Sequence, residues 1–333
     1  MSGALVAAVL RDPARAERLR RPQWNALIAA ARAEQLIGSV AARLDGIAMP
    51  AAAARILADA RASAEQGRVV ALWEAEAARR VLAPLDVPVV LLKGTAFAAA
   101  GLDAGRGRAI GDLDILVPRG YLDRVEDALL AAGWEWVKPD PYDDAYYRRW
   151  MHELPPLIHR TRDRMIDVHH TILPPTARPT PDAAALLADA VPLANGLFVL
   201  SNADMVVHAA AHLFADGDLQ GGLRNLWDID RLVREFAESD PDFCRSVTER
   251  AARHGLSAAT ARALRLAHRI YGTPGGGAAV PSDALFARRL LARDGWGRLR
   301  HKGTEFGFYV RSHWLRMPPA MLARHLWTKW RRS

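Results

Sequence analysis

The chain has 333 residues, half of them hydrophobic, and a formal net charge of +8. Its single cysteine, Cys244, excludes an internal disulfide framework and a cysteine-rich zinc site. No apolar run is long enough for an export signal or a membrane span, so we expect a cytoplasmic protein without a transmembrane segment. The positive charge suits an anionic partner, but the arginines are scattered, which favours solvated helix faces instead.

In chain order, three regions with different patterns follow one another. Residues 1–84 are alanine-rich, with apolar residues at helical spacing, a start signal at Pro22 and a long helix expected from about Ala52 to Leu82. Residues 85–175 have short apolar runs bounded by proline and glycine, the pattern of a small α/β core. Residues 176–333 are helical again, with turns expected at 195–196, 217–222 and 272–277. The expected fold class is α+β, a small mixed sheet flanked by two helical regions.

The central region contains the strand patterns. VPVVLLKG (Val87 to Gly94) and DLDILV (Asp112 to Val117) are expected to be buried strands, separated by the short helical piece TAFAAA and a glycine-rich loop. A helix is expected between Pro118 and Gly133. The segments GWEWV, LPPLIHR and RMIDVHHTI predict further strands.

Two aspartates, Asp112 and Asp114, stand one residue apart at the start of an apolar strand. Side chains alternate along a strand, so both carboxylates project to one face. Like charges this close repel each other unless a cation lies between them, and oxygen ligands favour Mg²⁺, with Mn²⁺ as the alternative. Asp167 supplies a third carboxylate from another apolar strand. Three such carboxylates can hold paired metals for in-line attack on phosphorus.

The segment LLKGTAF…RAIGDLDILV resembles the signature of the nucleotidyltransferase superfamily typified by DNA polymerase β. The set K-G-x-A, R-x-x-x-D-x-D-[ILV]-L-V and [IV]-D-[LV]-H is similar to a bacterial family of uncharacterised nucleotidyltransferases. The segments VVHAAAH and LRNLWDIDRLV resemble the helical half of that family. The resemblance covers about residues 87–235 and implies a polymerase β-like core.

The resemblance implies that three carboxylates are the catalytic metal ligands, namely Asp112, Asp114 and Asp167. It places Gly94 and Thr95 at a helix N-terminus that faces the triphosphate, where unpaired N–H groups favour anions. Lys93 or Arg108 would neutralise phosphate charge. Thr95 departs from the Ser or Gly of the wider superfamily, and the gap from Gly94 to Asp112 is longer than usual.

Structural roles are the alternatives for these residues. Asp112 could be a turn residue that follows Gly111, and Asp114 could be a partner of Arg108. Lys93 could extend from the end of a strand into solvent.

Several other polar side chains lie close to the motifs in the sequence. His169 shares a strand face with Asp167 and is expected beside the ligands or the substrate, whereas His170 points away and is expected to be structural. His208 and His212 are four residues apart on a helix, a spacing that suits a metal but favours a polar face that lines the cleft.

Arg224 and Asp228 are four residues apart on a helix as well, and they could lie beside the ligands of the site or form no more than an ion pair. In the basic, tryptophan-rich tail, helix packing by Trp314, Leu322 and Trp327 is favoured over contact with a membrane or nucleic acid.

The expected activity is Mg²⁺-dependent transfer of a nucleoside monophosphate from an NTP, expected to be ATP, to a small-molecule or macromolecular acceptor. A toxin-like transferase that acts on RNA or protein is one rival, and a catalytically inactive nucleotide-binding scaffold is the second. Intact acids at all three positions argue against the scaffold. A metal-dependent phosphohydrolase is the third rival, disfavoured because its His-Asp pair is absent from the sequence.

Overall fold

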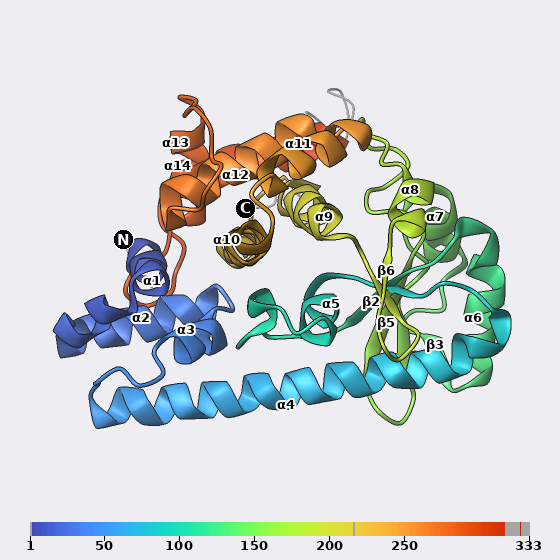
Figure 1. Cartoon of the computed structure of the whole chain (residues 1–333), viewed down its shortest axis with the longest axis horizontal. Coiled ribbons are helices and arrows are strands. Elements are labelled where there is room, and N and C mark those ends of the chain that lie inside the picture. Colours follow the sequence, from blue (N-terminus) through green and yellow to red (C-terminus); the bar gives the residue numbers. More distant parts are fainter. Residues whose placement is uncertain (1, 216, 317–326, 328–333) are drawn as a thin grey trace.

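A seven-stranded mixed sheet lies at one end of the molecule in the computed structural model, which describes residues 2–215, 217–316 and 327 (Figure 1). Its strands follow the order β3-β4-β5-β2-β1-β7-β6. Their bounds are β1 (Val90–Leu91), β2 (Leu113–Leu116), β3 (Trp134–Trp136), β4 (Leu157–His159), β5 (Met165–His169), β6 (Val191–Pro192) and β7 (Phe198–Val199). Strand β2 is parallel to β5 and β1 is parallel to β7, whereas the other neighbours are antiparallel. The expected α+β class with a mixed sheet is confirmed.

Helices form the rest of the fold. The N-terminal ones are α1 (Ser2–Arg11), α2 (Arg21–Ala33), α3 (Ile37–Arg43) and α4 (Ala51–Leu82). Those within or beside the sheet region are α5 (Lys93–Ala99), α6 (Leu122–Ala131), α7 (Pro141–Trp150) and α8 (Ala183–Ala188). The C-terminal ones are α9 (Asn202–Ala215), α10 (Gly222–Ser239), α11 (Phe243–Arg253), α12 (Ser257–Tyr271), α13 (Asp283–Leu290) and α14 (Lys302–Arg316). Short 3₁₀ turns join them, among them η3 (Asp103–Gly105).

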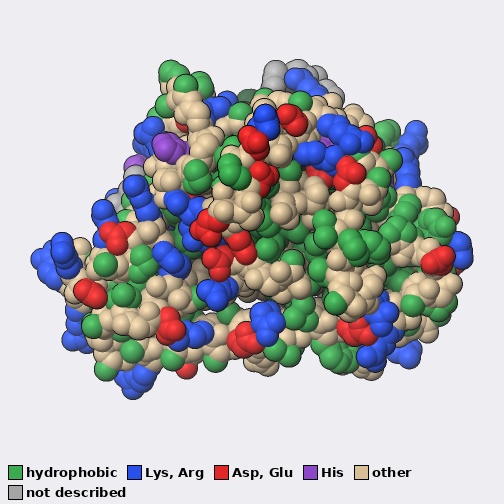
Figure 2. Space-filling view, viewed as in Figure 1, with side chains coloured by type: hydrophobic (Ala, Val, Ile, Leu, Met, Phe, Trp, Pro, Cys, Tyr) green, Lys and Arg blue, Asp and Glu red, His purple; other side chains and the backbone are tan. Residues whose placement is uncertain are grey.

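Helix α4 connects the two ends of the molecule. It begins one residue before the expected Ala52 and ends at the expected Leu82. Its first turns pack on α3, and its last turns pack on α6 and β2. Helix α4 therefore runs beneath the N-terminal helices at one end and the sheet at the other (Figure 1). Alanine is the best helix former, and the alanine-rich sequence sustains the exposed middle of this helix. The surface is hollowed between that middle stretch and the elements above it (Figure 2).

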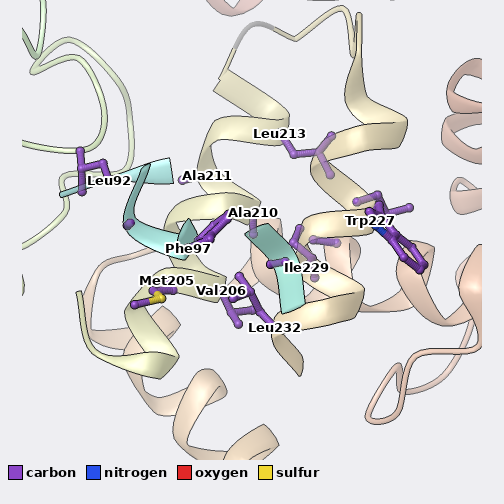
Figure 3. Close-up of a cluster of buried hydrophobic side chains, with 14 of the residues drawn as sticks. Leu92, Phe97, Met205, Val206, Ala210, Ala211, Leu213, Trp227, Ile229 and Leu232 are labelled. Carbon is purple, nitrogen blue, oxygen red and sulfur yellow. The ribbon is translucent and has the colours of Figure 1, made fainter. Parts of the chain in front are cut away.

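The hydrophobic core joins the sheet to the C-terminal helices. Helix α1 packs on α12, and α5 leaves the sheet toward α9 and α10. Leu92 and Phe97 are buried and belong to the same cluster of buried side chains as Val206 and Leu232 (Figure 3). This packing fixes the start of α5, and therefore the Lys-Gly-Thr segment, relative to the sheet and to the C-terminal helices.

The loop before β2 is held by a close backbone contact with α3. A Cβ atom at Gly38 would lie 2.2 Å from the carbonyl oxygen of Gly107, and one at Gly107 would lie equally close to the carbonyl oxygen of Gly38. Gly107 also has a φ of 68°, a conformation that glycine adopts without steric cost. The contact with α3 therefore fixes the position of the segment Gly107–Gly111, which leads into β2.

Several expectations need correction. Helix α7 was not expected, and strands β6 and β7 lie in a stretch expected to be helical. The strand expected from Val87 to Gly94 is only Val90–Leu91, and α5 begins at Lys93 rather than at Thr95. Of the tail, Leu322 lies outside the described residues, and Trp327 is more than half exposed.

Within the described part of the chain, the longest helices are too polar to cross a membrane.

Candidate active site

The three aspartates meet at the centre of the sheet. Strands β2 and β5 are neighbours, and their parallel register sets Asp114 directly beside Asp167. Asp112 lies just before β2. One carboxylate oxygen from each of the three lies within 4.8 Å of the others. Asp112 is exposed, Asp167 is partly buried and Asp114 is buried, so the cluster opens to solvent at Asp112.

Asp114 is held by two cationic or polar neighbours. Lys93 Nζ donates to its Oδ1 at 2.6 Å, and His169 Nε2 lies 2.9 Å from the same oxygen. Burial alone would raise the pKa of Asp114, but the His169 hydrogen bond and the Lys93 charge outweigh it and hold the pKa below its usual range. The structural alternative of an Asp114–Arg108 pair is wrong, because Lys93 takes that place.

Asp167 has the least favourable electrostatic environment of the three carboxylates. Its Oδ1 is buried and accepts no hydrogen bond from the described residues. Burial, followed by the negative charges of Asp114 and Glu153, raises its pKa to about 7. An unpartnered carboxylate oxygen beside two other carboxylates is the donor set that a hard divalent cation prefers, so these residues fit Mg²⁺ or Mn²⁺.

Lys93 begins α5 in a left-handed conformation. Its φ is 50°, which costs a residue with a side chain about 1–2 kcal/mol. The ammonium is directed at Asp114 and is three-quarters buried. Burial lowers its pKa, but the charge of Asp114 more than compensates, so its pKa is raised. Lys93 therefore stays charged beside the acids.

Gly94 is closely covered by Arg108. A Cβ atom at Gly94 would lie 2.0 Å from Arg108 Nη1 and 3.1 Å from Ile110 Cγ1, so a side chain here collides with the guanidinium. Thr95 follows inside the first turn, with its Oγ1 buried and without a hydrogen-bond partner among the described residues. The segment expected to face a triphosphate thus lies under a buried arginine.

Arg108 is held by a buried ion pair that joins two segments distant in the sequence. Its Nε donates to Oδ2 of Asp228 on α10, 120 residues away, at 3.0 Å. Both side chains are at most 7% exposed. Burial raises the pKa of Asp228 in spite of the positive charges of Arg108 and Arg224. The pair links the aspartate loop to the helical half of the molecule.

The structural alternative of an Arg224–Asp228 ion pair is wrong, because each residue has another partner. Asp228 pairs with Arg108, and Arg224 donates to Oε1 of Gln35 at 2.8 Å. Burial and the charge of Arg108 lower the pKa of Arg224, which the charges of Asp228, Asp112 and Asp114 partly offset. Arg224 therefore lies within electrostatic reach of the acids.

His169 and His170 lie on opposite faces of the sheet, as the alternation of side chains along a strand predicts. His169 lies in the site, in contact with Asp114, whereas His170 lies on the other face, 3.3 Å from the carbonyl oxygen of Met151. His208 is buried, and its pKa is well below normal because of burial and the charge of His212. The charges of Lys93 and His169 also act on His208, which places it beside the site. His212 lines a neighbouring cavity with Arg224.

Two residues of the site were not expected from the sequence. Glu153 Oε2 lies 3.3 Å from His169 Nδ1, and His152 lies beside the same ring. The three form a second cluster of potential metal-ligand atoms, next to the aspartates. Burial lowers the pKa of His152 to about 3 and raises that of Glu153. Their one sequence signal is an adjacent His-Glu pair just before the strand LPPLIHR.

The fold and site share four features that together define a class of enzyme. They are a mixed sheet, three clustered carboxylates, a basic residue that contacts the central carboxylate, and a second basic residue packed over a glycine at a helix start. Residues 20–272 match the family described as "Uncharacterised nucleotidyltransferase". The match covers more than half of the chain, so the protein belongs to this family and is a transferase whose general activity is nucleotidyl transfer. No curated protein matches the chain.

Proposed function

We propose that the sheet is a polymerase β-like core and that the protein transfers a nucleoside monophosphate from an NTP to an acceptor, with release of pyrophosphate. The single observation that carries this is the cluster of Asp112, Asp114 and Asp167 with a buried, unpartnered Oδ1 on Asp167. The family match supports the reaction class. ATP as the NTP, Mg²⁺ as the metal and a cytoplasmic location are parts of the same proposal.

In this proposal the three carboxylates hold the divalent metal. When bound, the metal would stabilise the negative charge that develops on the reacting phosphate. Asp114 is kept ionised by Lys93 and His169, so its ligand oxygens are available without loss of a proton. Asp112 is the most exposed of the three, so an acceptor would approach the cluster from the side of Asp112.

Basic side chains provide the remaining charge stabilisation. Lys93 precedes Gly94 and Arg108 packs over it, with Arg224 within electrostatic reach, so positive charge would lie close to a triphosphate at this helix start. Arg108 is oriented by its ion pair with Asp228. Catalysis would then consist mainly of positioning and electrostatic stabilisation by groups that are already in place.

Metal binding tests the carboxylate cluster directly. Calorimetric titration with Mn²⁺ should show a site in the parent that Asp167→Asn weakens about tenfold or more, because one anionic ligand is lost from a cluster of three. Asp59→Asn, an exposed position on α4, is the control with the same change of charge. Equal Mn²⁺ affinity in Asp167→Asn and the control would rule out this ligand set.

Gly94 tests the role of Arg108. Gly94→Ala places a methyl group against the guanidinium and should displace it from its present position. We expect NTP affinity to fall about tenfold or more, the loss of a charged hydrogen bond. In Gly67→Ala the new Cβ would meet only the carbonyl oxygen of Ile110, at 3.8 Å, so this variant serves as the control. An unchanged dissociation constant for ATP in Gly94→Ala would exclude Arg108 from phosphate binding.

A further inference from the structure

A second basic site lies away from the aspartates, where α10 meets the N-terminal helices. It is a cavity of about 470 Å³ whose lining is dominated by arginine. Its lining residues are Arg11 of α1, Arg43 of α3, Arg231 and Arg234 of α10, and Tyr271 and Gly272 at the end of α12. The size is that of a small-ligand site.

One buried carboxylate orients two of the arginines. Asp230 accepts from Arg231 Nε at 3.0 Å and from Arg234 Nε at 2.9 Å, and the hydroxyl of Thr273 donates to it at 2.7 Å. Arg234 also donates to the carbonyl oxygen of Gly272 at 2.7 Å. Both guanidinium groups are thus held in fixed positions, and their two positive charges share a single negative one.

The other two arginines lack an acidic partner within the described chain. Arg43 donates Nε to the carbonyl oxygen of Leu10 at 3.2 Å, which leaves its two terminal nitrogens for another acceptor. No hydrogen bond or ion pair of Arg11 occurs among the described residues. Asp103 is near Arg43, but its ion pair is with Arg106. Four guanidinium groups therefore surround one cavity with one carboxylate in direct contact.

This gathering of like charges is unfavourable in the protein alone. Burial and the positive charge of Arg231 lower the pKa of Arg43. Guanidinium groups bind phosphate oxygens in paired hydrogen bonds, so a ligand with several phosphate groups would relieve the repulsion. An adjoining cavity of about 200 Å³ shares Arg11 and adds Arg15 and Arg269, which extends the basic lining.

We infer that the arginine cavity is a second phosphate-binding site, which takes a row of phosphate groups from either a free oligophosphate or the backbone of a nucleic acid. It is separate from the aspartate site, because none of its lining residues is one of the three aspartates, Lys93 or Arg108. The inference does not depend on the proposed reaction.

Calorimetry of the full chain in a chelating buffer tests this site, because without metal the aspartates repel phosphate. The probes are inorganic tripolyphosphate and a ten-residue single-stranded RNA. At least one should bind the parent, and the double variant Arg11→Gln/Arg43→Gln should bind it about tenfold or more weakly. Arg55→Gln/Arg178→Gln changes two exposed arginines elsewhere and should bind like the parent.

The two probes separate the sources of phosphate. Tight tripolyphosphate binding that RNA does not displace would assign the cavity to a free oligophosphate. RNA binding that falls steeply with salt and weakens in Arg15→Gln/Arg269→Gln would assign it to a nucleic-acid backbone. If the double variant fails to fold, Arg11→Gln alone replaces it, since Arg11 is exposed. Absence of binding of both probes to the parent, or equal binding by parent and variant, would overturn the inference.

Discussion

Asp112→Asn should lower the rate of nucleotidyl transfer by about 10²–10³-fold or more while leaving the melting temperature unchanged. Asp112 is exposed, and no hydrogen bond or ion pair of its side chain occurs within the described structure, so the fold loses no contact. The carboxylate cluster loses one of three charges that a metal needs. Initial rates with saturating NTP and thermal melts in chelator measure the two effects separately.

The comparison with Asp114→Asn sharpens this test. Asp114 accepts from Lys93 and His169, so its replacement leaves a largely buried ammonium without its carboxylate and should also lower the melting temperature. Asp127→Asn, an exposed position on α6, controls for the change in net charge. If Asp112→Asn retains the activity of Asp127→Asn, Asp112 is a turn residue and the proposed ligand set is wrong.

Asp228→Ala should destabilise the protein by about 3–5 kcal/mol, the cost of leaving one partner of a buried ion pair without the other. Arg108 is 7% exposed, and water cannot easily replace the lost carboxylate. Chemical denaturation gives the free energy of unfolding. Glu238→Ala, on an exposed face of the same helix, controls for loss of an acid from α10.

A second variant separates stability from activity at this pair. Arg108→Met/Asp228→Leu removes both charges and should recover most of the lost stability, because an apolar pair has no desolvation cost. It should not recover nucleotidyl transfer, since the guanidinium above Gly94 is gone. Full activity in the double variant would show that Arg108 is architectural only.

The elements that the sequence predicted well are those with strong local signals. Helix α4 has alanine throughout and a proline after its end, and its bounds agreed within one residue. Strand β2 is an apolar run ended by Pro118, and the alternation of side chains along it placed Asp112 and Asp114 on the same side. Asp167 was expected beside them from its place in a second apolar strand, and the register of β5 on β2 agrees.

The elements that were missed depend on contacts distant in sequence. Strand β7 has two residues and exists because β1 offers it a parallel edge, which no local periodicity shows. For Asp228 the sequence offered only an ion pair within its own helix as the structural alternative, but tertiary packing brings Arg108 to it from the aspartate loop. Glu153 reaches His169 through a single bridge between their backbones, from a segment without regular periodicity.

The reaction itself is tested most directly by the fate of labelled phosphate. The parent is incubated with Mg²⁺, a cell extract and ATP labelled at either the α- or the γ-phosphate. The proposal predicts that α-label enters an acceptor, that the γ-label leaves as pyrophosphate, and that Asp112→Asn transfers neither. Entry of γ-label into the acceptor, or equal transfer of α-label by Asp112→Asn, would contradict a nucleotidyl transfer carried out by the aspartate cluster.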